Sequence, residues 1–79
     1  MRVYLEQFVF RGRKYDLEID YEHLGSKKGT RCVVEQGWLG SQEITPQLKQ
    51  RMEQEAFADL VAACKAEIAA FPDDYPLSN

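Results

Sequence analysis

Residues 15–22 read YDLEIDYE, and this stretch decides the fold. Apolar and acidic side chains alternate along it without exception, so the side-chain period is two. A period of two sends successive side chains to opposite faces of a β-strand, which predicts a half-buried strand rather than a helix. One face of the resulting sheet should be apolar and covered. The other should carry a comb of carboxylates, formed by Asp16, Glu18, Asp20 and Glu22.

The segment before this strand, residues 3–10, is rich in β-branched and aromatic residues and predicts a first strand. A loop of Gly12 and Arg13 would suit a tight hairpin, with glycine in the first central position. In the register that follows from this loop, the face with the carboxylates also carries three apolar residues of the first strand, namely Val3, Leu5 and Val9.

A third strand is predicted over residues 30–36, around a central Cys-Val-Val run, after a loop over residues 23–29. Gly37 and Gly40 then mark a second break, which places Trp38 on a turn and partly exposed. Two interpretations of Trp38 stay open. It closes the open end of the core, or it anchors a partner, since tryptophan is enriched among interface anchors.

The second half of the chain reads as a helix. Thr45 and Pro46 have the form of an N-cap followed by proline in the first turn. Apolar residues then recur at helical spacing as far as Phe71, which predicts one long helix over residues 46–71. Such a helix is about 39 Å long at about 1.5 Å per residue. It must therefore overhang the sheet or bend near residues 53–55.

Together these patterns predict an α+β fold: a three-stranded, mostly antiparallel sheet, made of a β-hairpin plus a third strand, covered on one face by a long C-terminal helix. Residues 1–71 are expected to form a single α+β domain, and residues 72–79 an irregular C-terminal tail. With 79 residues, the chain has room for one thin core and little room for an enclosed active site.

Composition excludes several classes of protein. The chain is 44% hydrophobic with a net charge of −3, which is too apolar and too weakly charged for a disordered chain. We see no run of about 18 apolar residues and no secretory signal, so we expect a cytoplasmic protein without membrane contact. Cys32 and Cys64 lack the spacing of a metal or redox motif. They are interpreted first as reduced, core-packed thiols, and second as one strand-to-helix bridge, which needs an oxidising compartment.

No residue set predicts an enzyme. His23 is the only histidine, and it lies in a predicted loop with no nucleophile at a recognisable spacing. The glycines of that loop lack the spacing of a phosphate-binding motif. The comb carboxylates lie about 7 Å apart along one strand, so they do not converge on one cation. We therefore expect no catalytic residue, no cofactor and no metal.

The first functional hypothesis is a small non-enzymatic protein that binds and modulates a larger protein partner. An uncovered apolar patch on a small protein usually has a use, and a second copy of the chain could also occupy it, giving a homodimer. For the comb alone, a solvated face and mimicry of a nucleic-acid backbone stay open. The expected contact residues are Trp38, Asp16, Glu18, Asp20, Glu22, Val3, Leu5 and Val9.

The alternative is a small nucleic-acid-associated protein that uses the basic loops at residues 11–14 and 27–31. We rank nucleic acid second, because the acidic balance of the chain opposes it and the two loops should lie at opposite ends of the sheet. The cations concerned are Arg11, Arg13, Lys14, Lys27, Lys28 and Arg31.

Residues 10–22, FRGRKYDLEIDYE, followed after a gap by residues 43–45 and a helix, resemble small phage- and prophage-encoded proteins of unknown function. The shared pattern is a hairpin with an acidic alternating second strand, a third strand and a helix opened by an Ile-Thr cap. It covers most of residues 3–71 and departs at Trp38 and at the proline-rich tail. Such proteins are often host-factor inhibitors or accessory factors, so the resemblance implies a binding role as an inhibitor or accessory factor of the anti-defence type. No functional residue carries over from it.

Overall fold

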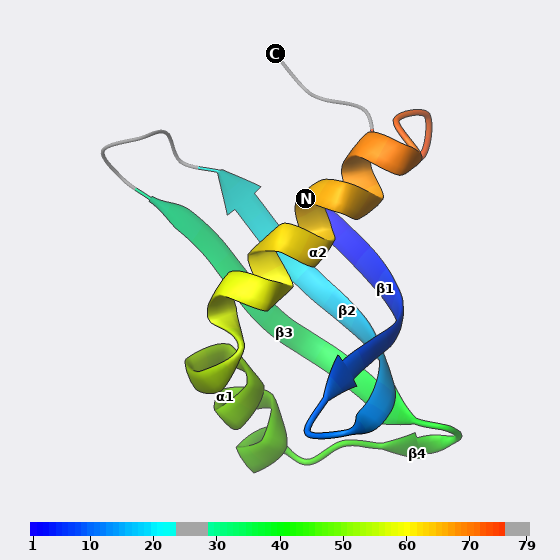
Figure 1. Cartoon of the computed structure of the whole chain (residues 1–79), viewed down its shortest axis with the longest axis vertical. Helices are drawn as coiled ribbons and strands as arrows, with labels where there is room; N and C mark the ends of the chain where they lie inside the picture. The colour runs from blue at the N-terminus through cyan, green and yellow to red at the C-terminus, as the bar shows by residue number, and fades with distance from the viewer. Residues whose placement is uncertain (24–28, 76–79) are drawn as a thin grey trace.

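The computed structural model describes residues 1–23 and 29–75, and Figure 1 shows them as a sheet with helices packed on one face. The strands within this part of the chain are β1 (Arg2–Phe10), β2 (Arg13–His23), β3 (Thr30–Leu39) and β4 (Gln42–Glu43). The helices are α1 (Pro46–Glu55) and α2 (Phe57–Ala70). Each strand pairs antiparallel with the next, in the order β1-β2-β3-β4. The α+β class and the antiparallel sheet are confirmed, but a short fourth strand was missed and the helix is divided.

The hairpin turn between β1 and β2 differs by one residue from the predicted loop. Phe10 pairs with Arg13, so the two central residues are Arg11 and Gly12, with φ of 53° and 79°. Two successive left-handed residues match the right-handed twist of the flanking strands, as in type I′ turns. The corrected loop shifts the register by two residues. Because the side-chain period is also two, this shift leaves every side chain on its predicted face.

A bulge in β1 does change the faces. Leu5 pairs with Leu17 and Phe8 with Tyr15, so residues 6–7 of β1 lie opposite one residue of β2. The extra residue turns the N-terminal half of β1 over. As a result, Val3 and Leu5 are buried, with 0% and 5% of their surface exposed, whereas Tyr4 is 53% exposed.

The bulge therefore decides which of the three predicted apolar contact residues are available. Val9 lies on the hairpin side of the bulge and keeps its predicted place, with 61% of its surface exposed. The prediction that Val3 and Leu5 lie on the uncovered face is wrong, because one extra residue in β1 moves both into the core. They are removed from the set of contact residues.

The residues around Gly37 continue β3 rather than forming a turn. Gly37 lies opposite Leu17, and a Cβ placed on it would lie 2.8 Å from Leu17 Cδ2 and 2.7 Å from Ile44 Cδ1. The backbone N–H of Ile44 also donates a hydrogen bond to the Gly37 carbonyl at 2.9 Å. The absence of a side chain at Gly37 thus lets Leu17 and Ile44 pack closely against the strand. The turn comes later, at Gly40, whose φ is 65°.

The helical segment begins as predicted and is interrupted once. The Thr45 hydroxyl accepts a hydrogen bond from the Leu48 N–H at 3.2 Å, and Pro46 is in the first turn. Ala56, with φ of −121° and ψ of 24°, divides the helix just after the predicted bend region. The break lets both helices stay over the sheet. Their fully buried residues are Met52 of α1 and Leu60 and Cys64 of α2.

Side chains from α1 cover the free edge of β3. The Val34 N–H donates a hydrogen bond to Glu53 Oε2 at 2.7 Å, and Lys49 Nζ donates one to the Glu35 carbonyl at 3.1 Å. An uncovered edge presents unpaired N–H and C=O groups to which another strand can add. These two contacts occupy one N–H and one C=O group of that edge near the middle of β3.

The packed part of the chain extends past the predicted domain boundary. Tyr75 is buried, and its hydroxyl accepts a hydrogen bond from the Tyr4 N–H at the edge of β1, at 3.2 Å. Residues 72–75 therefore include a core residue, whereas residues 76–79 of the predicted tail lie outside the described residues. Neither helix in the described part of the chain has the length and apolar character needed to cross a membrane.

Candidate functional site

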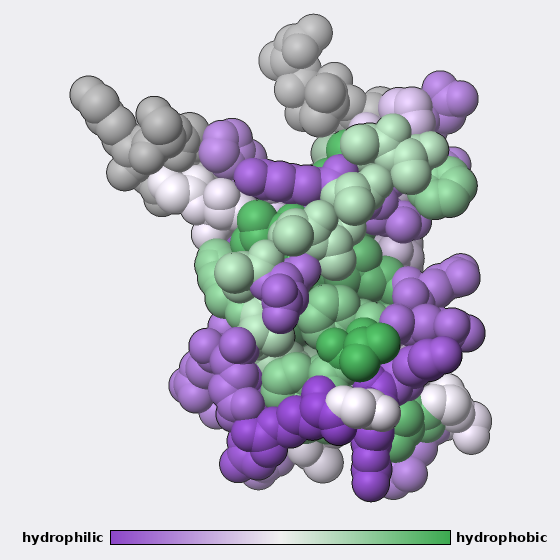
Figure 2. Space-filling model, in the orientation of Figure 1, coloured by the Kyte–Doolittle hydropathy of each residue, from purple (hydrophilic) through white to green (hydrophobic). Residues whose placement is uncertain are grey.

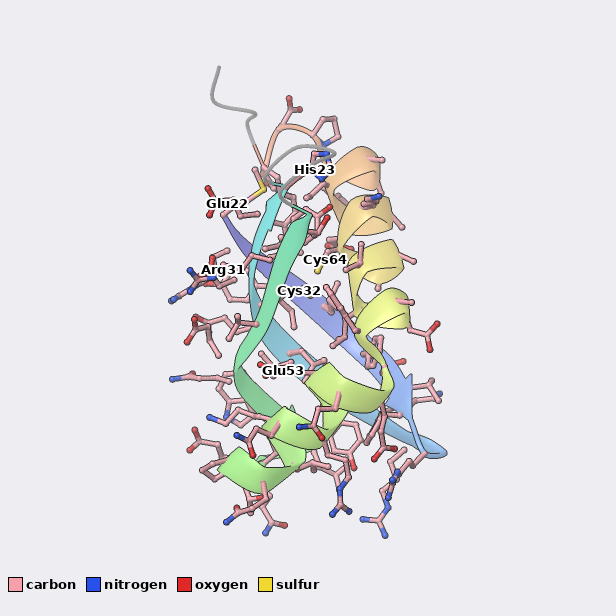
Figure 3. All side chains as sticks on the ribbon, turned by 90° about the vertical axis from the view of Figure 1, so that its left-hand side faces the viewer. Glu22, His23, Arg31, Cys32, Glu53 and Cys64 are labelled. Atoms are coloured by element: carbon pink, nitrogen blue, oxygen red, sulfur yellow. The ribbon has the colours of Figure 1, made fainter. Side chains whose placement is uncertain are left out.

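The sheet face that the helices leave uncovered is named here the outer face. Figure 3 views the sheet with the helices on one side, and Glu22 and Arg31 point away from the helices. The four carboxylates of the comb lie on this face, as predicted. Asp16 and Glu22 are exposed, whereas Glu18 and Asp20 are partly buried.

Cations from both neighbouring strands pair with the middle of the comb. Arg2 Nη1 of β1 lies 2.6 Å from Glu18 Oε1, and Arg31 Nη2 of β3 lies 3.2 Å from Asp20 Oδ2. The N-terminal amine lies 3.7 Å from the other oxygen of Asp20. Partly exposed pairs of this kind contribute little to stability. They convert an acidic stripe into a surface of alternating charge, which lowers the negative charge that mimicry of nucleic acid would need.

A groove of about 480 Å³ opens on the outer face beside the β1 bulge. Trp38 of β3 lies opposite Asp16 in the strand register, and both line the groove together with Tyr4. The Gln7 N–H donates a hydrogen bond to Asp16 Oδ1 at 3.1 Å, which fixes the bulge against β2. The groove thus combines two aromatic side chains with a carboxylate. This combination gives a partner both apolar and polar contact.

Gln7 gives the groove its position. Its φ of 55° lies in the left-handed region, which costs a residue other than glycine some free energy. Bulges and such residues concentrate at functional sites, where they redirect neighbouring side chains. Here the redirected side chain is Tyr4, which alternation between Val3 and Leu5 in the predicted register places on the covered face of the sheet. Sequence reasoning missed Tyr4 because alternation alone carries no signal for an inserted residue.

Trp38 was predicted to lie on a turn, and that placement is wrong. It lies within β3, partly buried, on the outer face. The interpretation that it closes the end of the core loses support, because Trp38 lines the outer groove. Its role as an anchor for a partner stays a prediction.

Among the described basic residues of the alternative hypothesis, those of the hairpin tip and Arg31 do not form one surface. Arg11 Nη2 lies 2.6 and 2.7 Å from the two carboxylate oxygens of Glu55, so Arg11 ties the hairpin tip to α1. Arg13 and Lys14 are exposed near that tip. Arg31 lies opposite Glu22 near the far end of β2, about 30 Å from Arg13 at about 3.3 Å per residue. The predicted opposite placement is confirmed for these residues, whereas Lys27 and Lys28 lie outside the described residues.

The two thiols lie between the sheet and α2. Cys64 is buried in the core, Cys32 is packed against it, and both are free. Figure 3 shows their side chains pointing toward one another from β3 and α2. This placement agrees with the first interpretation of packed thiols. It also brings together the two residues that the strand-to-helix bridge would join.

Sequence reasoning also missed the apolar character of the helical side. Figure 2 shows apolar surface over α2, with hydrophilic residues around it. A groove of about 650 Å³ lies there, lined by Phe57, Val61 and Lys65 among others, and Phe57 is 36% exposed. The sequence did contain a signal. Alanines at positions 58, 62 and 66 recur every four residues, so they share one side of α2.

A third groove, of about 600 Å³, lies at the C-terminal end of α2. Tyr21, His23, Ile68 and Tyr75 line it. His23 ends β2 rather than lying in the loop, and its Nδ1 is 3.3 Å from the Thr30 hydroxyl. Across residues 1–23 and 29–75, no three His, Cys, Asp or Glu side chains are grouped to hold a metal ion.

No protein-family model, curated protein or solved structure matches this chain.

Proposed function

We propose that this chain is a small non-enzymatic protein that binds a larger protein partner through the outer face of its sheet. The observation that carries the proposal is the groove at the β1 bulge. There Trp38 and the 53% exposed Tyr4 stand beside Asp16. Tryptophan and tyrosine supply large contact areas at a low cost in conformational entropy, and they dominate interface energetics.

The charges around this groove suit a protein partner better than a nucleic acid. Protein interfaces combine an aromatic centre with a polar rim, and the pairs Arg2–Glu18 and Arg31–Asp20 supply mixed charge near the groove. A phosphate backbone requires concentrated positive charge instead. The nucleic-acid alternative keeps its own test: a gel shift at low ionic strength, where no complex would remove it.

The identity of the partner is a further step. We propose, on the resemblance to phage and prophage proteins alone, that the partner is a host factor which the chain inhibits or modulates. A second copy of the chain is the other occupant of the outer face. Light scattering after size-exclusion chromatography distinguishes the two, because a homodimer doubles the mass without any added protein.

The test uses the full chain as immobilised bait in a bacterial lysate, followed by direct binding with the purified candidate. Trp38→Ala and Tyr4→Ala should each weaken binding at least about tenfold, the effect of losing an interface anchor. Phe57→Ala is the matched control, because it removes an exposed aromatic ring from the opposite side of the molecule. Each variant is first checked for an unchanged circular dichroism spectrum.

Two results would contradict the proposal. Binding that survives both outer-face substitutions would show that the groove is not the contact. Binding lost with Phe57→Ala but kept with Trp38→Ala would transfer the interface to α2.

A further inference from the structure

The paired thiols lie apart from the proposed contact surface. Cys32 lies opposite Tyr21 in the register of β3 with β2, on the side of the sheet that faces the helices. Cys64 extends from the middle of α2 and has no exposed surface. Cys32 keeps partial exposure, and the two side chains point toward one another (Figure 3). Cys32 is thus the more accessible residue of the two, and Cys64 is shielded from solvent.

The surroundings make the two thiols unequal. The hydrogen bond with Cys64 lowers the pKa of Cys32, although burial and the nearby carboxylate of Glu53 act in the opposite direction. The same hydrogen bond raises the pKa of Cys64, and burial and Glu67 raise it further. Burial chiefly, and then both thiols, raise the pKa of Tyr21. Since thiolates are the reactive form, these contacts favour Cys32 as the attacking group and keep Cys64 protonated.

We propose that Cys32 and Cys64 form an oxidation site, in which hydrogen peroxide or a small alkyl peroxide converts the facing thiols into a disulfide between β3 and α2. The Cys32 thiolate attacks one peroxide oxygen, the O–O bond breaks, and the leaving oxygen takes a proton as water or an alcohol. Cys32 is then a sulfenic acid. The Cys64 sulfur attacks it, the S–O bond breaks, and a water leaves with the Cys64 proton. With hydrogen peroxide, two thiols yield one disulfide and two waters.

The disulfide would act on the body of the fold rather than on the outer face. It would close the chain between residues 32 and 64, a segment that includes β4, α1 and the break at Ala56. Closing a long segment lowers the conformational entropy of the unfolded chain, so the oxidised protein should resist unfolding more than the reduced protein. The site does not depend on the proposed function, because neither thiol lines the groove at Trp38.

The experiment treats the reduced, purified full chain with hydrogen peroxide, alkylates remaining thiols in denaturant and measures the intact mass. The wild type should lose two hydrogen atoms, take up no alkyl group and remain a monomer. Cys64→Ser should stop at a sulfenic acid on Cys32, trapped by dimedone. Cys32→Ser should keep its Cys64 thiol unmodified over the same time.

A second measurement needs no variant. The reaction is repeated in urea, where the thiols are no longer held together and the yield of the monomeric disulfide should fall severalfold. The oxidised chain should also unfold at a higher urea concentration than the reduced chain. Two alkylatable thiols left in the treated wild type, or a disulfide between two chains, would overturn the proposal. An equal yield in urea would overturn it as well.

Discussion

Ile19 and Asp20 are consecutive residues of β2, and they occupy opposite environments. Ile19 has no exposed surface and lies in the core beneath the helices. Asp20 lies on the outer face, where Arg31 and the N-terminal amine pair with it. The two faces of one sheet thus have different roles. Apolar burial on the inner face supplies the stability, because each fully buried aliphatic side chain contributes about 1.5–3 kcal/mol.

The outer face contributes little to stability, so its side chains are free to serve the recognition that we propose. Its ion pairs are partly exposed, and such pairs contribute about 0–1 kcal/mol. Along β1, the single extra residue at the bulge determines which side chains lie on the inner face and which lie on the outer face. Substitutions on each face, and at the bulge itself, test whether this division is correct.

Deletion of Gln7 should have the largest effect. Without the extra residue, β1 would have to place Val3 and Leu5 on the outer face and Tyr4 in the core, or abandon half of its pairing with β2. Loss of the two buried side chains predicts a decrease of about 4 kcal/mol in the free energy of unfolding. Urea denaturation followed by circular dichroism measures it. Gln7→Gly, which keeps the bulge and relieves the positive φ, is the control and should cost nothing. Equal stability of the deletion variant would contradict the bulge.

Ile19→Ala and Asp20→Ala form the next test, since they probe the two faces at adjacent positions. Removing buried atoms from Ile19 leaves a cavity and should lower the free energy of unfolding by about 3 kcal/mol. Asp20→Ala removes exposed ion pairs and should lower it by less than about 1 kcal/mol. Both are measured by urea denaturation under one buffer. Similar losses for the two variants would show that the outer face is structural.

Gly37→Ala tests how closely the inner face is packed. The added methyl group would press on Ile44 and Leu17 at distances below 3 Å, and overpacking of this kind should cost about 2 kcal/mol. Ile44→Val in the same chain removes the Cδ1 atom nearest to that methyl group. The double variant should therefore be less destabilised than the sum of the two single variants. Strict additivity would mean that the two residues do not contact.

The sequence predicts the elements that depend on a regular pattern. The alternation in β2 is strong enough to give the strand, its buried face and the comb, and Thr45-Pro46 gives the start of α1. The interruption at Ala56 has no such signal, because alanine has the highest helix propensity of all residues. Only the length of the helix relative to the sheet indicated a bend. Packing against the sheet, rather than local preference, sets its position.

The candidate site was predictable in its residue types more than in its geometry. Trp38 and the comb follow from composition and alternation, and both lie on the outer face. The groove depends on the bulge at residues 6–7, and nothing in the local sequence marks one inserted residue in an apolar strand. Tyr4 was consequently assigned to the core, and Val3 and Leu5 to the surface. A single register error on one strand thus exchanged part of the core with part of the site.

Arg2→Gln should have the smallest effect. It removes the pair with Glu18 Oε1, in which the Arg2 side chain is 55% exposed, and should lower the free energy of unfolding by about 0.5 kcal/mol at low salt. At about 1 M salt the Debye length falls to about 3 Å, so the difference from the wild type should disappear. Arg13→Gln, at the exposed hairpin end of β2, is the matched control and should show no change at either salt concentration. A loss that persists at high salt would mean that Arg2 stabilises β1 by packing its aliphatic stem on the outer face. The structural part of the sheet would then include side chains of the outer face, beyond what the ion pairs indicate.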